Sequence, residues 1–186
     1  AGRVPIIAGT GSNDTLYALD LVRCAQEAGA DAALVVTPYY NKTTQRGLIA
    51  HYNAIADCSD LPIILYNVPS RTGVCLASDT IAELAKHPNI NGIKAASGNF
   101  TLLAETMAKC GDNLNVWSGN DDQIVPLLAL GGLLTYLYET QKTDLKQLDK
   151  LEWYRTGQFM ELDLAARRNL ELTETLRSKE KKGSLL

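Results

Sequence analysis

Lys94 is the residue of this sequence best placed by its neighbours for covalent chemistry. It follows Ile93 at the end of an apolar run in the stretch "NGIKAASGN", residues 91–99, so we expect it at the end of a buried strand. Burial disfavours a charged ammonium group. A neutral amine is a nucleophile that can attack a ketone and form a Schiff base, which acts as an electron sink for the adjacent carbon. Most lysines at strand ends are solvated and inert, so this role requires supporting groups nearby.

Three further side chains could support such a reaction, because forming and dehydrating a carbinolamine both move protons. Tyr66 ends the preceding predicted strand and is a candidate proton shuttle, and Tyr40, one strand earlier, could extend the relay. Arg71 follows Tyr66 by five residues, and its planar guanidinium group could hold a substrate carboxylate. The competing interpretation is structural: buried tyrosines are mostly core residues with a bonded hydroxyl group, and Arg71 could pair with a surface acid.

These residues fall within a repeat of short strands and longer helices. Apolar, β-branched runs alternate with segments that are apolar at helical spacing, and corresponding points of the repeat are about 24 to 29 residues apart, the length of a βα unit. Five such units in series predict a parallel sheet that is buried on both faces. The predicted strand segments are 4–12, 31–40, 61–73, 90–98 and 114–121, and the predicted helical segments are 15–30, 45–59, 78–88, 100–111 and 122–132.

The polar residues of each unit follow the apolar part of its strand. Carboxyl ends of parallel strands share one edge of the sheet, which is where α/β barrels and open α/β sheets bind ligands. We therefore expect Lys94 and Tyr66 to point from neighbouring strands into one mouth. The pattern changes after Gly132 to two predicted helices, over 133–157 and 159–183, with no strand between them.

The amino-acid composition and net charge argue against membrane, nucleic-acid-binding and metal-binding functions. The 186 residues carry a net charge of −3 and are 46% hydrophobic, which is typical of one soluble globular domain. No run of 18 apolar residues and no signal-peptide pattern occurs, and the weakly acidic balance gives no reason to expect a membrane or nucleic acid partner. The four cysteines form no CxxC pair, so we expect reduced, mostly packed thiols in a cytoplasmic protein, and we expect no metal site.

Four stretches closely resemble the dihydrodipicolinate synthase family, also called 4-hydroxy-tetrahydrodipicolinate synthase. They are "TPYYNKTTQRGL", "DLPIILYNVPSRTG", "GIKAASGN" and "SGNDDQIVPLLALGG", and the similarity runs in order through residues 3–132. The resemblance implies a (β/α)₈ TIM-barrel fold of the class I aldolase type. It also implies a lyase that condenses pyruvate with aspartate semialdehyde in lysine (diaminopimelate) biosynthesis and needs no cofactor beyond the covalent imine.

The resemblance also implies roles for individual residues. Lys94 matches the Schiff-base lysine, Tyr66 the proton-relay tyrosine, and Tyr40 the tyrosine that reaches into a neighbouring subunit's site. Arg71 matches the arginine at the site entrance. Asn13 and Tyr39 match positions near which lysine binds at a dimer interface in feedback-regulated members. The form Asn-Val-Pro-x-Arg-Thr-Gly favours the synthase over the related sugar-acid lyases.

The chain departs from the family pattern in length and at both ends of the barrel. The family's two early strands, with a Thr-Thr pair, and its eighth strand have no counterpart in these 186 residues, which fall below the roughly 250 of typical barrels. Three explanations stay open: another chain fills the gaps, the fold is an altered remnant, or the sequence is a trimmed record of a longer protein. We expect residues 1–132 to form a partial barrel and 133–186 a helical C-terminal segment of the same domain. Exposed strand edges predict self-association. Two hypotheses stay open: a pyruvate-dependent lyase, or a catalytically impaired paralogue that acts in binding or assembly.

Overall fold

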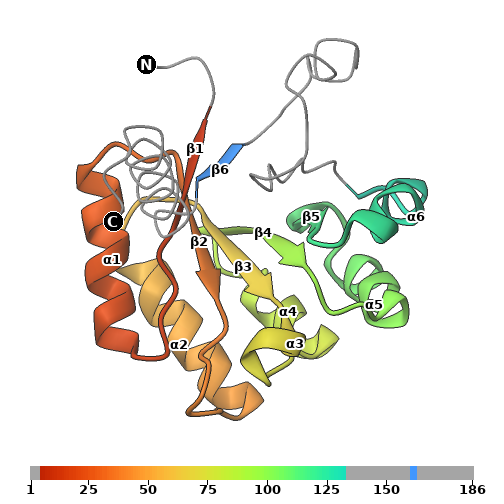
Figure 1. The fold of residues 1–186 in the computed structure, drawn as a ribbon, viewed down its shortest axis with the longest axis horizontal. Helices are drawn as coiled ribbons and strands as arrows, with labels where there is room; N and C mark the ends of the chain where they lie inside the picture. The colour runs from red at the N-terminus through yellow and green to blue at the C-terminus, as the bar shows by residue number, and fades with distance from the viewer. Residues whose placement is uncertain (1–4, 133–159, 163–186) are drawn as a thin grey trace, which may run out of the picture.

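Six parallel strands form one sheet in the computed structural model, which describes residues 5–132 and 160–162 (Figure 1). Neighbours in the sheet follow the order β5-β4-β3-β2-β1-β6. The strands are β1 (Ile6–Gly9), β2 (Ala32–Val36), β3 (Ile63–Asn67), β4 (Ile90–Ala95), β5 (Asn115–Ser118) and β6 (Met160–Leu162). The first five therefore lie side by side in the order of the sequence, as the repeat predicts.

At least one helix follows each of the strands β1 to β5, with two after β3, and several begin where a polar side chain caps them. Asp14, Thr44 and Asn99 each accept a hydrogen bond from a backbone N–H group in the first turn of the helix that follows. The helices are α1 (Thr15–Glu27), α2 (Gln45–Asp57), α3 (Pro69–Thr72), α4 (Ser78–Leu84), α5 (Phe100–Cys110) and α6 (Ile124–Ala129), with 3₁₀ turns η1 (Gly111–Asn113) and η2 (Asp121–Gln123).

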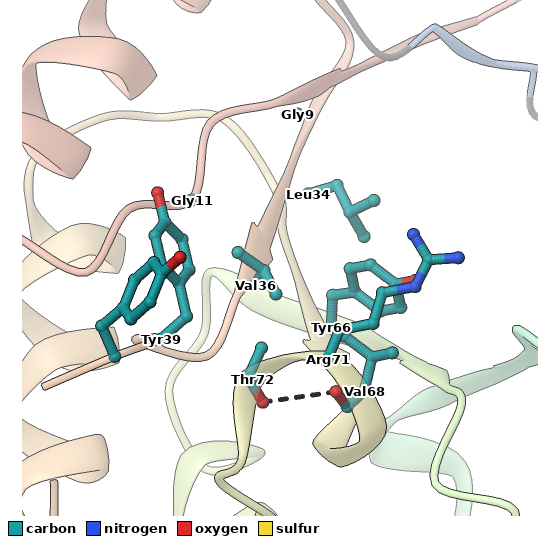
Figure 2. A pocket seen from close by; sticks show the side chains of 10 residues that line it. Gly9, Gly11, Leu34, Val36, Tyr39, Tyr66, Val68, Arg71 and Thr72 are labelled. Carbon is teal, nitrogen blue, oxygen red and sulfur yellow. Dashed lines mark hydrogen bonds between the residues drawn. The ribbon is translucent and has the colours of Figure 1, made fainter. Parts of the chain in front are cut away.

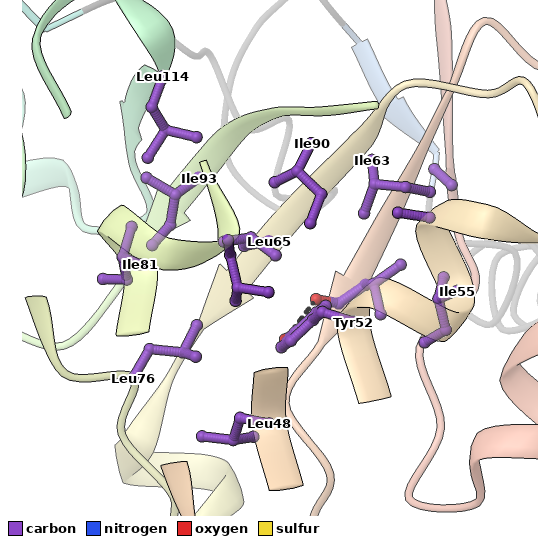
Figure 3. Packing of buried hydrophobic residues seen from close by; sticks show 14 of the residues in the cluster. Leu48, Tyr52, Ile55, Ile63, Leu65, Leu76, Ile81, Ile90, Ile93 and Leu114 are labelled. Atoms are coloured by element: carbon purple, nitrogen blue, oxygen red, sulfur yellow. Dashed lines mark hydrogen bonds between the residues drawn. The ribbon is translucent and has the colours of Figure 1, made fainter. Parts of the chain in front are cut away.

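Neighbouring residues of β1, β2, β3 and β5 enter two separate hydrophobic clusters, and β4 contributes to the first of them. One cluster packs residues such as Val35, Leu65 and Ile93 against the helices, and Figure 3 shows this layer. The other contains strand residues alone: Ile7, Ala32, Leu34, Ile64 and Trp117, with Tyr66 packed against them. The described helices that enter the core thus cover one face of the sheet. Together with the sequential strand order, this is the winding of a barrel and not of a doubly wound sheet, whose helices cover both faces.

The strand β6 corrects one prediction. Residues 159–183 were expected to be helical, yet Met160–Leu162 extend beside β1 in parallel register, with Ile6 opposite Met160. The physical reason is the open edge of β1, because unpaired backbone N–H and C=O groups are satisfied by another strand and not by a helix. For the same reason, β1 is not one of the exposed strand edges that we expect from five strands in series. At the other end, β5 is the last strand of the described sheet.

The rest of the predicted helical segment, 133–159 and 163–186, lies outside the described residues. Within the described part, no helix is long and apolar enough to cross a membrane. All four cysteines are free thiols. Cys110 is buried and Cys58 partly so, but Cys24 and Cys75 are exposed, so the expectation of mostly packed thiols holds for only half of them.

Candidate active site

A cavity of about 460 Å³ opens at the carboxyl ends of β1, β2 and β3. Figure 2 shows Tyr39 and Arg71 on either side of Val36 in this view, with Tyr66 beside Arg71. The residues that line it are Gly9, Gly11, Leu34, Val36, Tyr39, Tyr40, Tyr66, Val68, Arg71 and Thr72. The structure therefore brings four of the six predicted site residues to one cavity, at the edge of the sheet that the strand pattern predicts.

Lys94 lies next to this cavity, on β4, directly beside Tyr66 on β3. The two residues are register partners in the parallel ladder, and the Lys94 Nζ atom lies 4.3 Å from the centroid of the Tyr66 ring. Only 7% of Lys94 is exposed. Its neighbours Ile93 and Ala95 pack toward the helices, so the alternation of the strand turns Lys94 toward the face that carries Tyr66. Tyr66 thus connects the lysine to the cavity.

Two glycines keep backbone segments close at this edge. A Cβ atom added to Gly119, just after β5, would lie 2.7 Å from the Ala96 Cβ atom and 3.4 Å from the Lys94 Cε atom. A Cβ atom on Gly11 would lie 2.4 Å from the backbone nitrogen of Val36. Any larger residue would force the strand ends apart, so both positions shape the surroundings of the cavity.

Tyr39 and Tyr40 differ in their surroundings. Tyr40 is 91% exposed and has φ 63°, a left-handed conformation that is uncommon for a bulky residue. The Tyr39 ring meets it edge to face, with 6.1 Å between ring centroids. Asn13 is outside the cavity lining, but its backbone carbonyl accepts a hydrogen bond of 3.2 Å from the Asn41 amide. The β1–α1 loop is therefore tied to the segment that carries both tyrosines.

Arg71 sits in α3, a single helical turn that follows β3. Its side chain is exposed and faces the cavity, which suits an entrance position. The turn begins after Val68, has proline at its first position, and ends at Gly73 with φ 70°. Two buried hydroxyl groups beside it, those of Thr37 and Thr72, are 3.0 Å apart. Sequence reasoning missed this pair, although both threonines end motifs, "VVT" and "SRT", that lead into polar loops.

The described residues contain no group of three or more His, Cys, Asp or Glu side chains that could hold a metal ion. The groups gathered at the cavity are an amine, phenolic hydroxyls and a guanidinium. This set can bind a small carboxylate and can support amine chemistry at a ketone.

Parallel strands in sequence order, helices on one face of the sheet, and polar residues at the carboxyl ends of the strands define an α/β protein of the TIM-barrel type. Comparison with known proteins agrees. The model of the Dihydrodipicolinate synthetase family matches residues 1–182, and the chain belongs to this family. The resemblance found in the sequence motifs is confirmed.

Individual relatives point the same way. The chain is 48% identical over 169 residues to the 4-hydroxy-tetrahydrodipicolinate synthase of Exiguobacterium sibiricum, covering 88% of this chain and 58% of that protein. It is 58% identical over 133 residues to the synthase of Caldicellulosiruptor saccharolyticus, covering 72% and 45%. Among solved structures, a chloride-inhibited dihydrodipicolinate synthase of Acinetobacter baumannii complexed with pyruvate matches with TM-score 0.70 and 50% identity, covering 72% of this chain and 46% of that one. The chain thus spans about half the length of these relatives.

Proposed function

We propose that this chain carries the Schiff-base site of a pyruvate-dependent lyase that condenses pyruvate with aspartate semialdehyde in lysine biosynthesis. The observation that carries the proposal is the pairing of Lys94 with Tyr66. A lysine that is 7% exposed has its Nζ atom over a tyrosine ring, and that tyrosine lines a cavity of about 460 Å³. Family membership supports the same assignment.

Lys94 provides the nucleophile in this proposal. The lone pair of its Nζ atom attacks the ketone carbon of pyruvate, a proton moves from Nζ to the former ketone oxygen, and the carbinolamine loses water to leave an imine. Loss of a proton from the pyruvate methyl group then gives an enamine. The enamine carbon attacks the aldehyde carbon of aspartate semialdehyde, the aldehyde C=O π bond breaks as its oxygen takes up a proton, and the imine re-forms. Addition of water to the imine then breaks the bond to Nζ and releases the product. No cofactor takes part, because the protonated imine itself is the electron sink.

The remaining residues move protons and bind carboxylates. Tyr66, beside Lys94, shuttles the protons of carbinolamine formation and dehydration. Tyr40 extends the relay, and its 91% exposure fits a side chain that completes the site of a neighbouring subunit. Arg71 binds a substrate carboxylate at the mouth of the cavity. In a regulated form of this protein, Asn13 and Tyr39 would be the residues near which lysine binds.

The proposal includes a homo-oligomer in the cytoplasm. The last described strand, β5, has an open edge, and exposed edges of parallel sheets favour association. Tyr40 needs a partner chain if it acts across subunits. The edge of β5 and the exposed Tyr40 ring both support self-association of this chain.

A second candidate function keeps the family's fold without turnover. In that case the chain is a catalytically impaired paralogue that acts in binding or assembly, with the exposed Tyr40 ring at its surface. A related 2-keto-acid aldolase, such as a sugar-acid lyase, would share the Lys94 and Tyr66 chemistry and differ in its second substrate.

One experiment separates these candidates. The purified chain is incubated with millimolar pyruvate and borohydride, and its intact mass and peptide map are recorded. We expect one reduced pyruvyl group on the peptide that contains Lys94 and none in the Lys94→Ala variant. No adduct in a protein with a cooperative thermal transition would overturn the lyase assignment. An adduct without turnover of aspartate semialdehyde would favour the impaired or sugar-acid candidates.

A further inference from the structure

The arginine at the cavity mouth depends on a very small structural element. Helix α3 has four residues, and a single helical turn is not stable by itself. Its internal backbone bonds are few: the Arg71 and Thr72 N–H groups donate to the Val68 carbonyl, and the Gly73 N–H group donates to Pro69. The position of Arg71 must therefore come from contacts that hold the turn against the rest of the barrel.

The hydroxyl group of Thr72 is at the centre of those contacts. It is buried, with 6% of the residue exposed. Its oxygen accepts from the Thr37 hydroxyl at 3.0 Å and from the Val74 N–H group at 3.3 Å. Its proton lies within reach of the Val74 carbonyl at 3.0 Å and the Val68 carbonyl at 3.3 Å. A hydroxyl has one proton and two acceptor sites, so the full bonding capacity of this group is used.

Thr37 links this turn to the neighbouring strand. The residue is fully buried just after β2, and its hydroxyl donates to Thr72 across 35 positions of sequence. Its backbone N–H group also donates to the Tyr66 carbonyl at 3.2 Å. One threonine thus contacts both the strand that carries Tyr66 and the turn that carries Arg71.

The loop beyond α3 is held by other residues. The Gln45 side chain donates to the Cys75 carbonyl and accepts from the Ala77 N–H group and the Thr80 hydroxyl. The Asn67 side chain accepts from the Leu76 N–H group. These bonds secure the segment after Val74. The side-chain hydrogen bonds of Thr72, in contrast, reach α3 itself.

We propose that the Thr37–Thr72 hydroxyl pair is a positioning pair, which holds Arg71 where its guanidinium group can bind a carboxylate in the cavity. This inference rests on the proposed function, because it assigns Arg71 to carboxylate binding. The pair touches no reacting atom and acts through Arg71. The pair acts through its hydrogen bonds and not through its packing volume. Valine at position 72 would preserve the volume of threonine and remove the hydrogen bonds of its hydroxyl group, whereas serine would keep them.

The test uses glutarate, a dicarboxylate without a ketone, because it cannot form an imine with Lys94. Calorimetry on the full chain measures its affinity for wild type, Arg71→Gln, Thr72→Val, Thr72→Ser and the double variant Arg71→Gln/Thr72→Val. We expect Arg71→Gln to weaken binding roughly tenfold or more, since it removes a charge-assisted hydrogen bond. Thr72→Val should weaken binding several-fold, and Thr72→Ser should restore most of the affinity.

The double variant separates positioning from general destabilisation. If Thr72 acts through Arg71, Thr72→Val should have no further effect in the Arg71→Gln background. Thr106→Val is the matched control: Thr106 is 2% exposed and its hydroxyl donates to the Leu102 carbonyl within α5, away from the cavity. It should leave glutarate affinity unchanged. If Thr72→Val fails to give a cooperative thermal transition, Thr37→Val replaces it, because that variant leaves the remaining bonds of Thr72 in place.

Each outcome decides the proposal. Equal losses for Thr72→Val in both backgrounds, no rescue by serine, or no glutarate binding by wild type would overturn it. Borohydride trapping with pyruvate is run on the same wild-type sample. A pyruvyl adduct without glutarate binding overturns the positioning pair alone, and glutarate binding with the expected coupling but no adduct overturns the lyase assignment alone.

Discussion

Replacing His51 with phenylalanine should remove a loss of stability that the protein suffers at mildly acidic pH. His51 lies on α2, is 5% exposed, and packs edge to face on the Tyr52 ring at 5.3 Å. Its Nδ1 atom lies 2.9 Å from the Thr15 hydroxyl. Its Nε2 atom is buried and has no hydrogen-bond partner among the described residues. Burial lowers the pKa of His51 from the ordinary value of 6.5, since a charged ring would be poorly solvated there.

The direction of the pH effect follows from proton binding. Below pH 6.5 the unfolded chain protonates His51, while the folded protein keeps the ring neutral until the pH reaches the lowered pKa. Unfolding therefore takes up a proton in this window, and stability falls as the pH falls. At pH 5.5 the loss is as much as about 1.4 kcal/mol, because one pKa unit corresponds to that free energy. For a chain of this size that upper limit corresponds to a drop in melting temperature of at most about 3–6 °C.

Thermal unfolding followed by circular dichroism between pH 7.5 and pH 5.5 measures this drop. In His51→Phe, which keeps an aromatic ring of similar size, the drop should disappear. His87→Gln is the control, because His87 is the other histidine of the sequence and its ring contacts Asp57 near the surface. The drop should persist in that variant. A His51→Phe protein that loses stability as steeply as wild type would refute the assignment to His51.

Three variants, one control variant and one measurement on the wild type test other parts of the structure. Tyr66→Phe should slow imine formation with pyruvate by roughly 10²–10⁴-fold in a quenched borohydride assay; an unchanged rate would return Tyr66 to a packing role. Tyr52→Phe removes a buried hydroxyl that donates to a β2 carbonyl at 3.1 Å, and urea unfolding should show a loss of about 1 kcal/mol. Gly119→Ala should cost about 1–3 kcal/mol and slow trapping, since the new Cβ atom would lie 2.7 Å from Ala96. Gly9→Ala is its control, because a Cβ atom there meets nothing within 4 Å, and equal losses in both would contradict the packing account. Light scattering across a dilution series should show self-association, and the mass of one chain at every concentration would count against it.

The sequence by itself determined the repeating units and the neighbourhood of Lys94. Apolar runs about one βα unit apart are a local property, and sequential parallel strands follow from it. Because side chains alternate along a strand with a period of two, Lys94 and Tyr66 at matching strand ends had to share a face. Their pairing in the ladder confirms the shared face. Tyr66 lines the cavity at the carboxyl edge, and Lys94 lies beside Tyr66.

Only the tertiary structure decided how distant loops meet. The hydrogen bond between Thr37 and Thr72 spans 35 residues, and no local pattern announces it. Likewise, Met160–Leu162 extends beside β1, although its own sequence predicts a helix. In both cases the stabilising hydrogen bonds join groups that are far apart in the chain. A buried hydroxyl group and an unpaired strand edge need hydrogen-bond partners only after the sheet has formed.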